Sequence, residues 1–171
     1  GGGTGTALMA SVAQKTGTSS PSFGVKVAAM DVDGNGSDEL VFSDTAAVHD
    51  GIADDADSNC TAAAGSFCGE VYVYQVAGNS GALGAPPVAG EASPAALLNV
   101  IRGHGGSGSA FGSSLGVVSE GGNEYLVVAG GSNGYQPVVI GGIAGSGITP
   151  ALYPSPGAGA LVVGDFTTLG N

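Results

Sequence analysis

The feature that most constrains this chain is the segment 31–42, which reads DVDGNGSDELVF. Its first, third, fifth and ninth positions carry oxygen-bearing side chains, on Asp31, Asp33, Asn35 and Glu39. Gly36 at the sixth position permits the sharp turn that a loop around one cation requires. With the backbone carbonyl of Ser37 as a further ligand, the donor set is all oxygen, which favours calcium over softer metals. The segment therefore predicts a Ca2+-binding loop, and Asp38 is the competing candidate for the last ligand.

The residues on either side of this loop indicate strands and not helices. Phe23–Met30 alternates in part, and Leu40–Phe42 is short, β-branched and aromatic, as strands are. An EF-hand needs flanking helices and a bidentate Glu at its twelfth position, where this chain has Phe42. We therefore expect the loop to join two β-strands. The alternative is an Asp- and Gly-rich turn that binds no metal.

The order of motifs around the loop resembles the FG-GAP repeat. Phe23-Gly24 precedes the loop, residues 69–74 read GEVYVY, and Phe111-Gly112 opens a second unit. FG-GAP repeats build the β-propeller headpiece of integrin α subunits and occur in many secreted proteins. The resemblance is good over residues 22–130 and weak elsewhere. It implies an all-β fold made of blades of antiparallel strands, with calcium held by the ligands given above; the family usually has Asp where this chain has Glu39.

On this resemblance the chain divides into four parts. Residues 1–21 are the tail of a preceding blade or a linker, and 22–108 form a blade with the calcium loop and an insertion at 44–68. Residues 109–158 form a second blade, and 159–171 start a third unit. Propellers close with about four to eight four-stranded blades, so we expect a partial propeller. Either the chain is a piece of a longer polypeptide, which we favour, or the ring or array closes between copies.

The second unit lacks the ladder of alternating Asp and Asn side chains. Residues 119–124 read SEGGNE between two runs that are typical of strands, and we expect a metal-free turn there. In the first unit, Tyr72 and Tyr74 alternate with valines in a predicted strand, so we expect these tyrosines to pack in the core and not to form a ligand platform.

Composition and charge indicate a secreted β protein. The chain has 34 glycines and a net charge of −11, with 14 acidic residues against three Lys and Arg. Most of the acids lie between Asp31 and Asp57, as expected if cations neutralise part of their charge. The chain lacks the basic patch that nucleic acids and anionic membranes require. It also has no apolar run near the ~20 residues that span a bilayer, so we expect no membrane insertion.

The insertion at 44–68 holds three further candidate sites. Cys60 and Cys68 are expected to form a disulfide that pins this loop, the alternative being two free buried thiols. Asp55, Asp57 and Asn59 repeat the spacing of the first calcium ligands, so they are a possible second calcium site, although a solvated acidic loop is the simpler interpretation. Asn59 also begins a sequon and is a possible glycosylation site.

Enzyme motifs are scarce, and we expect no catalytic activity. Residues 112–116 match the Gly-x-Ser-x-Gly nucleophile elbow, but that elbow requires a strand-to-helix turn and Val117-Val118 continues a β pattern. His49 and His104 lie in no motif that brings either near Ser114.

The sequence therefore favours an extracellular or cell-surface calcium-binding segment that serves as a structural or adhesive scaffold. Its expected partners are a protein or glycan ligand at the cell surface or matrix, or copies of itself. Three alternatives stay open: a structural subunit of an extracellular polymer that assembles through blade edges, a carbohydrate-binding propeller, and an accessory domain of a secreted enzyme.

Overall fold

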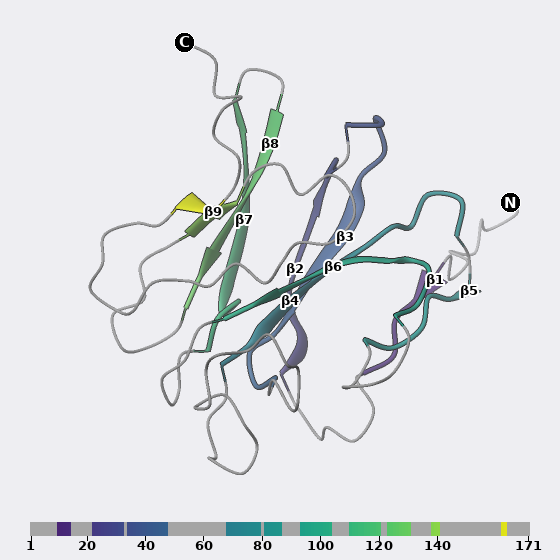
Figure 1. The fold of residues 1–171 in the computed structure, drawn as a ribbon, viewed down its shortest axis with the longest axis horizontal. Coiled ribbons are helices and arrows are strands. Elements are labelled where there is room, and N and C mark those ends of the chain that lie inside the picture. Colours follow the sequence, from purple (N-terminus) through teal and green to yellow (C-terminus); the bar gives the residue numbers. More distant parts are fainter. Residues whose placement is uncertain are drawn as a thin grey trace, which may run out of the picture.

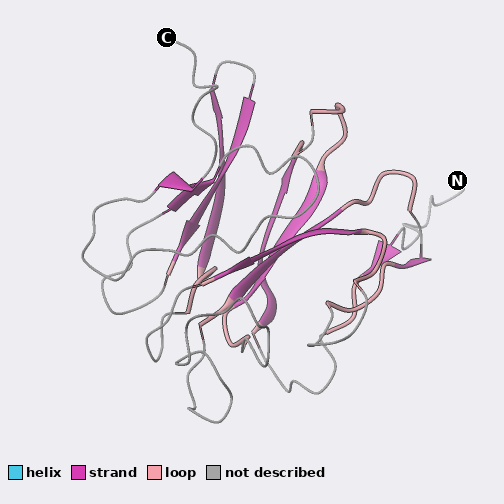
Figure 2. Cartoon of the chain, viewed as in Figure 1, coloured by secondary structure: helices cyan, strands magenta, loops and turns pink. Residues whose placement is uncertain are grey.

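The structure is a computed structural model of the 171-residue chain. It describes residues 10–14, 22–32, 34–47, 68–79, 81–86, 93–103, 110–120, 123–130, 138–140 and 162–163. These residues form β-strands, turns and connecting segments, with no helix among them (Figure 2). The expectation of an all-β fold with antiparallel sheets is confirmed for this part of the chain. Closure into a propeller is not seen in it.

The first sheet contains four antiparallel strands in chain order. They are β2 (Phe23–Met30), β3 (Glu39–Asp44), β4 (Glu70–Tyr74) and β6 (Leu97–Arg102). The two strands expected around the Asp31 loop are thus confirmed as β2 and β3. The expected GEVYVY strand is β4, and all five of its residues are buried. Because β4 is central and both faces of this sheet are covered, Tyr72 and Tyr74 are core residues, as predicted.

The second sheet follows the first along the chain. It consists of β7 (Ser114–Glu120), β8 (Asn123–Ala129), β9 (Val138–Ile140) and β10 (Val162–Val163), in the order β10-β9-β8-β7. Strands β7, β8 and β9 pair antiparallel, whereas β10 pairs with β9 in parallel. Glu120 pairs with Asn123, so only Gly121 and Gly122 separate β7 from β8. The two strands predicted on either side of residues 119–124 are confirmed. Residues 164–171 lie outside the described residues, and the start of a third unit stays a prediction.

The two sheets pack face to face around the main hydrophobic core (Figure 1). β2 and β7, the first strands of the two sheets, lie close to each other. The core combines buried residues of both sheets with the residues that follow β2 and precede β7: Met30, Val32, Val41, Val71, Val73, Ile101, Phe111, Leu126 and Val128. Burial of this apolar surface is the main force that holds the sheets together.

The opposite face of the first sheet is aromatic. Phe42 stacks on Tyr74 with ring centroids 5.6 Å apart and an interplanar angle of 22°. Phe42 also lies 5.4 Å from the Tyr72 ring and 5.1 Å from that of Phe23. Two short strands, β1 (Ala10–Ser11) and β5 (Gly81–Ala82), pair in parallel on this side (Figure 1). The first sheet is therefore the middle layer of three.

The junction between the sheets depends on close backbone contacts at Phe111. The Phe111 N–H donates to the carbonyl of Cys68 at 3.1 Å. Gly69 adopts a φ of +83°, and a Cβ there would lie 2.2 Å from the carbonyl oxygen of Phe111. A Cβ on Gly103 would lie 2.4 Å from both the carbonyl oxygen of Cys68 and the Phe111 Cβ. Only glycine fits at either position, because a side chain would collide with backbone atoms.

The insertion predicted at 44–68 begins and ends at one closed neck. The carbonyl of Ala47 accepts the N–H groups of both Cys68 and Gly69, at 3.2 and 3.3 Å. Ala47 and Cys68 are both fully buried. The chain therefore leaves the first sheet and returns to it at a single point. Residues 48–67 lie outside the described residues.

Candidate functional site

The candidate site is the connection between β2 and β3, which begins at Asp31. Gly34 and Gly36 adopt φ values of +73° and +85°, a conformation that L-residues with side chains resist. A Cβ at either glycine would meet no atom within 4 Å. The two glycines are therefore required by the path of the backbone and not by close packing.

The side chain of Asp31 organises this loop. Its Oδ1 accepts the N–H of Asn35 at 3.0 Å, and its Oδ2 accepts the N–H of Gly36 at 2.8 Å. Asn35 continues the pattern, because its Oδ1 accepts the N–H of Ser37 at 2.8 Å. The loop therefore winds around the carboxylate of its first residue, and backbone N–H groups turn toward the predicted ligand atoms.

The two candidates for the last ligand point in different directions. Glu39 is fully buried, and its Oε2 accepts the N–H of Val32 at 2.9 Å. Asp38 is exposed. Glu39 is therefore turned back toward the start of the loop, where Asp31 lies, whereas Asp38 faces solvent. This geometry fits Glu39 better than Asp38 as a ligand.

The donor chemistry of this loop fits a calcium ion. An ionised carboxylate has about four lone-pair sites, so the hydrogen bonds that the Asp31 carboxylate accepts from Asn35 and Gly36 leave it further sites for a cation. Asn35 adds an amide oxygen and Ser37 a backbone carbonyl, both of which calcium accepts. Asp33 lies outside the described residues. Among those that are described, no group of three or more His, Cys, Asp or Glu side chains is gathered to hold a metal ion.

Glu124 was not identified as a site residue from the sequence. It lies on β8 of the second sheet, and its Oε2 accepts the N–H of Asp31 at 2.8 Å. Its Oε1 accepts the hydroxyl of Ser119, its partner across the β7–β8 pair, at 3.4 Å. The sequence indicates the hairpin that carries Glu124, but only the packing of the two sheets brings that hairpin to the loop.

The sites predicted in the insertion are not described by the structure. Asp55, Asp57, Asn59 and Cys60 all lie outside the described residues. Cys68 is fully buried beside the junction of the two sheets. The disulfide, the second calcium site and the glycosylation of Asn59 therefore stay predictions.

A pair of buried carboxylates lies at the other end of β3. Asp44 pairs with Glu70 across β3 and β4, and both residues are fully buried. The Tyr72 hydroxyl donates to Oε2 of Glu70, and Asp44 Oδ1 accepts the N–H of Ala46 at 3.0 Å. Burial raises the pKa of the Tyr72 phenol, and the charge of Glu70 raises it further. No pattern in the sequence indicates this pair, since Asp44 ends one ordinary strand and Glu70 begins another.

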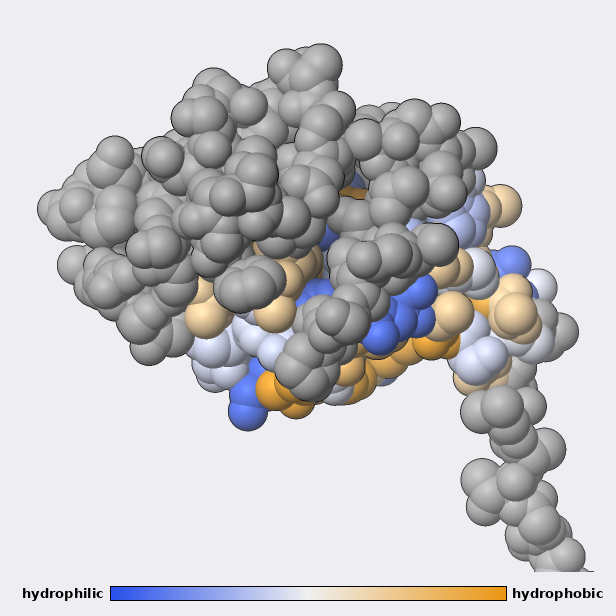
Figure 3. All heavy atoms as spheres, turned by 90° about the horizontal axis from the view of Figure 1, so that it is seen from below, coloured by the Kyte–Doolittle hydropathy of each residue, from blue (hydrophilic) through white to orange (hydrophobic). Residues whose placement is uncertain are grey.

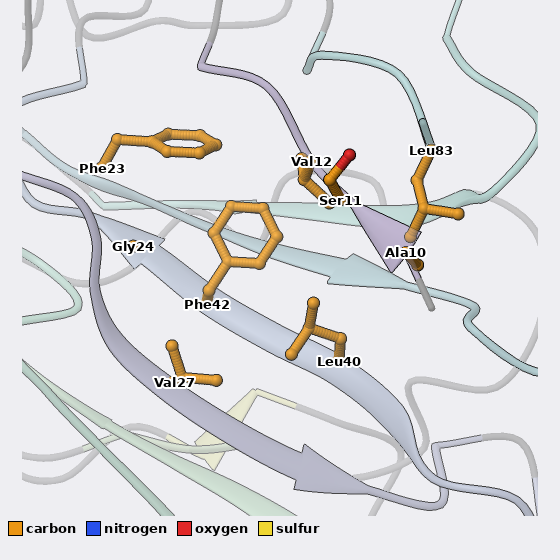
Figure 4. Close-up of a pocket in the computed structure, with 9 residues that line it drawn as sticks. All are labelled: Ala10, Ser11, Val12, Phe23, Gly24, Val27, Leu40, Phe42 and Leu83. Atoms are coloured by element: carbon orange, nitrogen blue, oxygen red, sulfur yellow. The ribbon is translucent and has the colours of Figure 1, made fainter. Parts of the chain in front are cut away.

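An open apolar groove of about 210 Å3 lies between β1, β2 and β3 (Figure 4). Figure 4 shows Phe42 and Leu40 facing Val12, Ala10 and Leu83 across it. Its lining is apolar apart from backbone and one hydroxyl: Ala10, Ser11, Val12, Phe23, Gly24, Val27, Leu40, Phe42 and Leu83. Ligand sites usually add several convergent polar groups to such a lining. This groove offers surface for packing and not groups for chemistry.

Exposed apolar residues also occur on the strands themselves. Val25, Val27 and Val118 are between 52% and 61% exposed. On the face drawn in Figure 3, hydrophobic and hydrophilic described residues lie side by side.

The serine in the Gly-x-Ser-x-Gly match does not lie on a nucleophile elbow. Ser114 is the exposed first residue of β7, and the strand continues to Glu120, where the elbow requires a helix. Gly112 instead serves the contact with the first sheet, since a Cβ on it would lie 2.6 Å from Ser43 Cβ.

A scan against models of known protein families finds no match to this chain, and a sequence search of curated proteins finds none either. None of the described residues belongs to a helix that is long and apolar enough to cross a membrane.

Proposed function

We propose that this chain is a calcium-stabilised β scaffold of the FG-GAP type, acting outside the cell in a structural or adhesive role. The observation that carries the proposal is the Asp31 loop, in which backbone N–H groups hold the side chains of Asp31 and Asn35 in place. A propeller-type arrangement is supported by the first sheet, whose four antiparallel strands follow chain order as those of a blade do. The second sheet packs against its face.

Calcium would stabilise the loop by neutralising clustered acidic side chains. The ligands would be Asp31, Asp33, Asn35, the Ser37 carbonyl and Glu39. Without a cation, the three carboxylates among them repel one another, and repulsion is stronger for a buried group such as Glu39 than for exposed ones. The cation would thereby fix the β2–β3 hairpin and the edge of the core beneath it.

The proposal predicts that chelation lowers thermal stability. If calcium is present at about 100 times its Kd, its removal costs about 2.7 kcal/mol. For a domain of this size that loss lowers Tm by on the order of 5–10 °C. Differential scanning calorimetry in calcium and in EDTA measures this shift. Asp33→Ala should remove most of it, and Asp38→Ala should leave it unchanged if Glu39 is the last ligand. A melt that EDTA does not alter would count against the site.

The adhesive role requires a protein or glycan partner at the cell surface or matrix. The acidic charge of the chain and its pair of cysteines support an extracellular setting, and an exposed scaffold with an apolar groove supports binding over catalysis. Binding to a glycan array and to matrix proteins, each with and without calcium, tests this role. Calcium-dependent capture of a glycan would favour the carbohydrate-binding alternative.

A second candidate function is a subunit that polymerises through strand edges. Among the described residues β2 pairs only with β3 and is an edge of the first sheet, and it exposes Val25 and Val27. Exposed apolar edge strands are templates for pairing with another chain. Analytical ultracentrifugation over a range of concentrations tests this function, since a polymer-forming subunit would sediment as larger species as concentration rises.

A further inference from the structure

Glu124 joins the loop to a part of the molecule that is distant in the sequence. Its Oε2 lies 2.8 Å from the backbone nitrogen of Asp31, and 93 positions separate the two residues. Asp31 follows the last residue of β2 in the first sheet, whereas Glu124 belongs to β8 in the second. The hydrogen bond therefore connects the two sheets at the root of the loop.

Asp31 is thus held at both its backbone and its side chain. Its N–H is bonded to Glu124, and its carboxylate accepts the N–H groups of Asn35 and Gly36. A shift of the Asp31 backbone would move the carboxylate around which the whole loop is wound. Glu124 is in turn oriented by Ser119, which donates to its second oxygen. Charge-assisted bonds of this kind, from a backbone N–H to a carboxylate, are stronger than neutral ones.

We propose that Glu124 is a positioning residue for the Asp31 loop, and that it links calcium binding at the loop to the packing of the second sheet on the first. The inference rests on the proposed calcium-binding function. Outer-shell partners orient the ligands of metal sites, and their loss weakens metal affinity. Calcium binding at the loop and packing of the second sheet on the first are then linked, and such linkage is reciprocal. Calcium that fixes Asp31 must therefore also favour the packing of β8 against the loop.

Glu124 can affect calcium binding in two ways, through its negative charge or through its hydrogen bond to Asp31. Two substitutions separate the effect of the charge from that of the hydrogen bond. Glu124→Gln keeps an oxygen that accepts the Asp31 N–H but removes the charge. Glu124→Ala removes both. Glu120→Gln removes one negative charge from the same hairpin and is the matched control.

The experiment is calorimetric titration of the full chain and its variants with Ca2+ alone. We expect Glu124→Ala to weaken calcium binding about tenfold or more, the range found for outer-shell partners. Glu124→Gln should stay within about threefold of the unsubstituted protein, because a neutral acceptor forms a weaker but similar hydrogen bond. The calcium affinity of Glu120→Gln should be equal to that of Glu124→Gln or higher.

Hydrogen exchange gives a readout that affinity alone does not. Calcium should slow exchange of the β7 and β8 amides in the unsubstituted protein but not in Glu124→Ala. In EDTA, the Asp31 amide should exchange slowly in the unsubstituted protein and faster in Glu124→Ala.

Equal losses of affinity in Glu124→Gln and Glu124→Ala would overturn the positioning role in favour of charge. An unchanged affinity in Glu124→Ala would overturn it as well. If the unsubstituted protein binds no calcium, the proposed function and the linkage both fail. The measurement in EDTA then decides separately whether Glu124 holds Asp31, since an Asp31 amide that exchanges equally fast in both proteins would overturn that contact too.

Discussion

The two Phe-Gly pairs of this chain lie in different surroundings. Phe111 is 2% exposed, and Gly112 fits against the first sheet, where a Cβ would lie 2.6 Å from Ser43 Cβ. Phe23 is only half-buried, and a Cβ on Gly24 would meet nothing within 4 Å. Both glycines have positive φ, of +84° and +71°. The glycine of the dipeptide therefore adopts positive φ in both places, although Gly24 lies within β2 and Gly112 lies in the turn before β7. The neighbouring sheet determines how tightly each pair is packed.

Phe111 packs in the core between the two sheets, whereas Phe23 lies at the open apolar groove. Phe23 and Gly24 line it together with residues of β1 and β3. The second sheet packs beside Phe111, whereas in the described part of the chain the strands on the Phe23 side of the first sheet are the short β1 and β5. The comparison predicts that equivalent substitutions in the two pairs have unequal costs.

The largest difference is expected between Phe111→Ala and Phe23→Ala. Removing a fully buried Phe leaves a cavity and costs about 3–5 kcal/mol, so Phe111→Ala should lose that much stability. Phe23→Ala should cost about 1–2 kcal/mol, because its ring is already partly in water. Urea denaturation of the two variants measures both values. Equal costs would mean that the groove side of the first sheet is as well packed as the core.

The glycines provide a smaller and cleaner contrast. An alanine at positive φ costs about 1–2 kcal/mol at either position, and this is the whole cost expected for Gly24→Ala. Gly112→Ala should cost about 1–3 kcal/mol more, because its Cβ would overlap Ser43. Gly116→Ala is the control, since its position has open space and no positive φ. Similar midpoints for Gly24→Ala and Gly112→Ala would show that the contact at Ser43 relaxes without cost.

The smallest effect is a pH dependence from the aromatic face under Phe23. Burial raises the pKa of Tyr74 to about 12, and burial together with the charge of Glu70 raises that of Tyr72. A phenol whose pKa is higher in the folded state than in the unfolded state stabilises the folded protein as long as the phenol is protonated. For Tyr74 this contribution is complete below pH 10, the pKa of the phenol in the unfolded chain, and is lost as pH rises toward 12. Absorbance near 295 nm should show tyrosines that ionise together with unfolding. Full ionisation near pH 10 in a folded protein would contradict this.

Much of the fold could be predicted from local patterns, and most of the site's surroundings could not. The strands at β2, β3, β4, β7 and β8 follow from β-branched and aromatic runs between turn residues. β6 was not recognised, because LLNVIR carries no clear alternation. It pairs on β4 and completes the first sheet.

The site could likewise be predicted where its contacts are local in the sequence, and not where they join distant elements. The spacing of Asp31, Asn35 and Ser37 marks a loop that closes on itself, since every contact among them spans five residues or fewer. Glu124 and the Asp44–Glu70 pair depend on contacts between elements far apart in the chain. Such contacts depend on how strands pair and sheets pack, and the local residue pattern does not indicate which distant elements come together.

The closed neck at Ala47 makes the first sheet a promising host for grafted peptides. One carbonyl holds both ends of the insertion together, so the ends are already as close as a graft needs them to be. Doubling the length of a flexible loop adds only about 0.6 kcal/mol of closure cost. A library of binding loops of different lengths could therefore replace residues 48–67 while β3 and β4 keep their register.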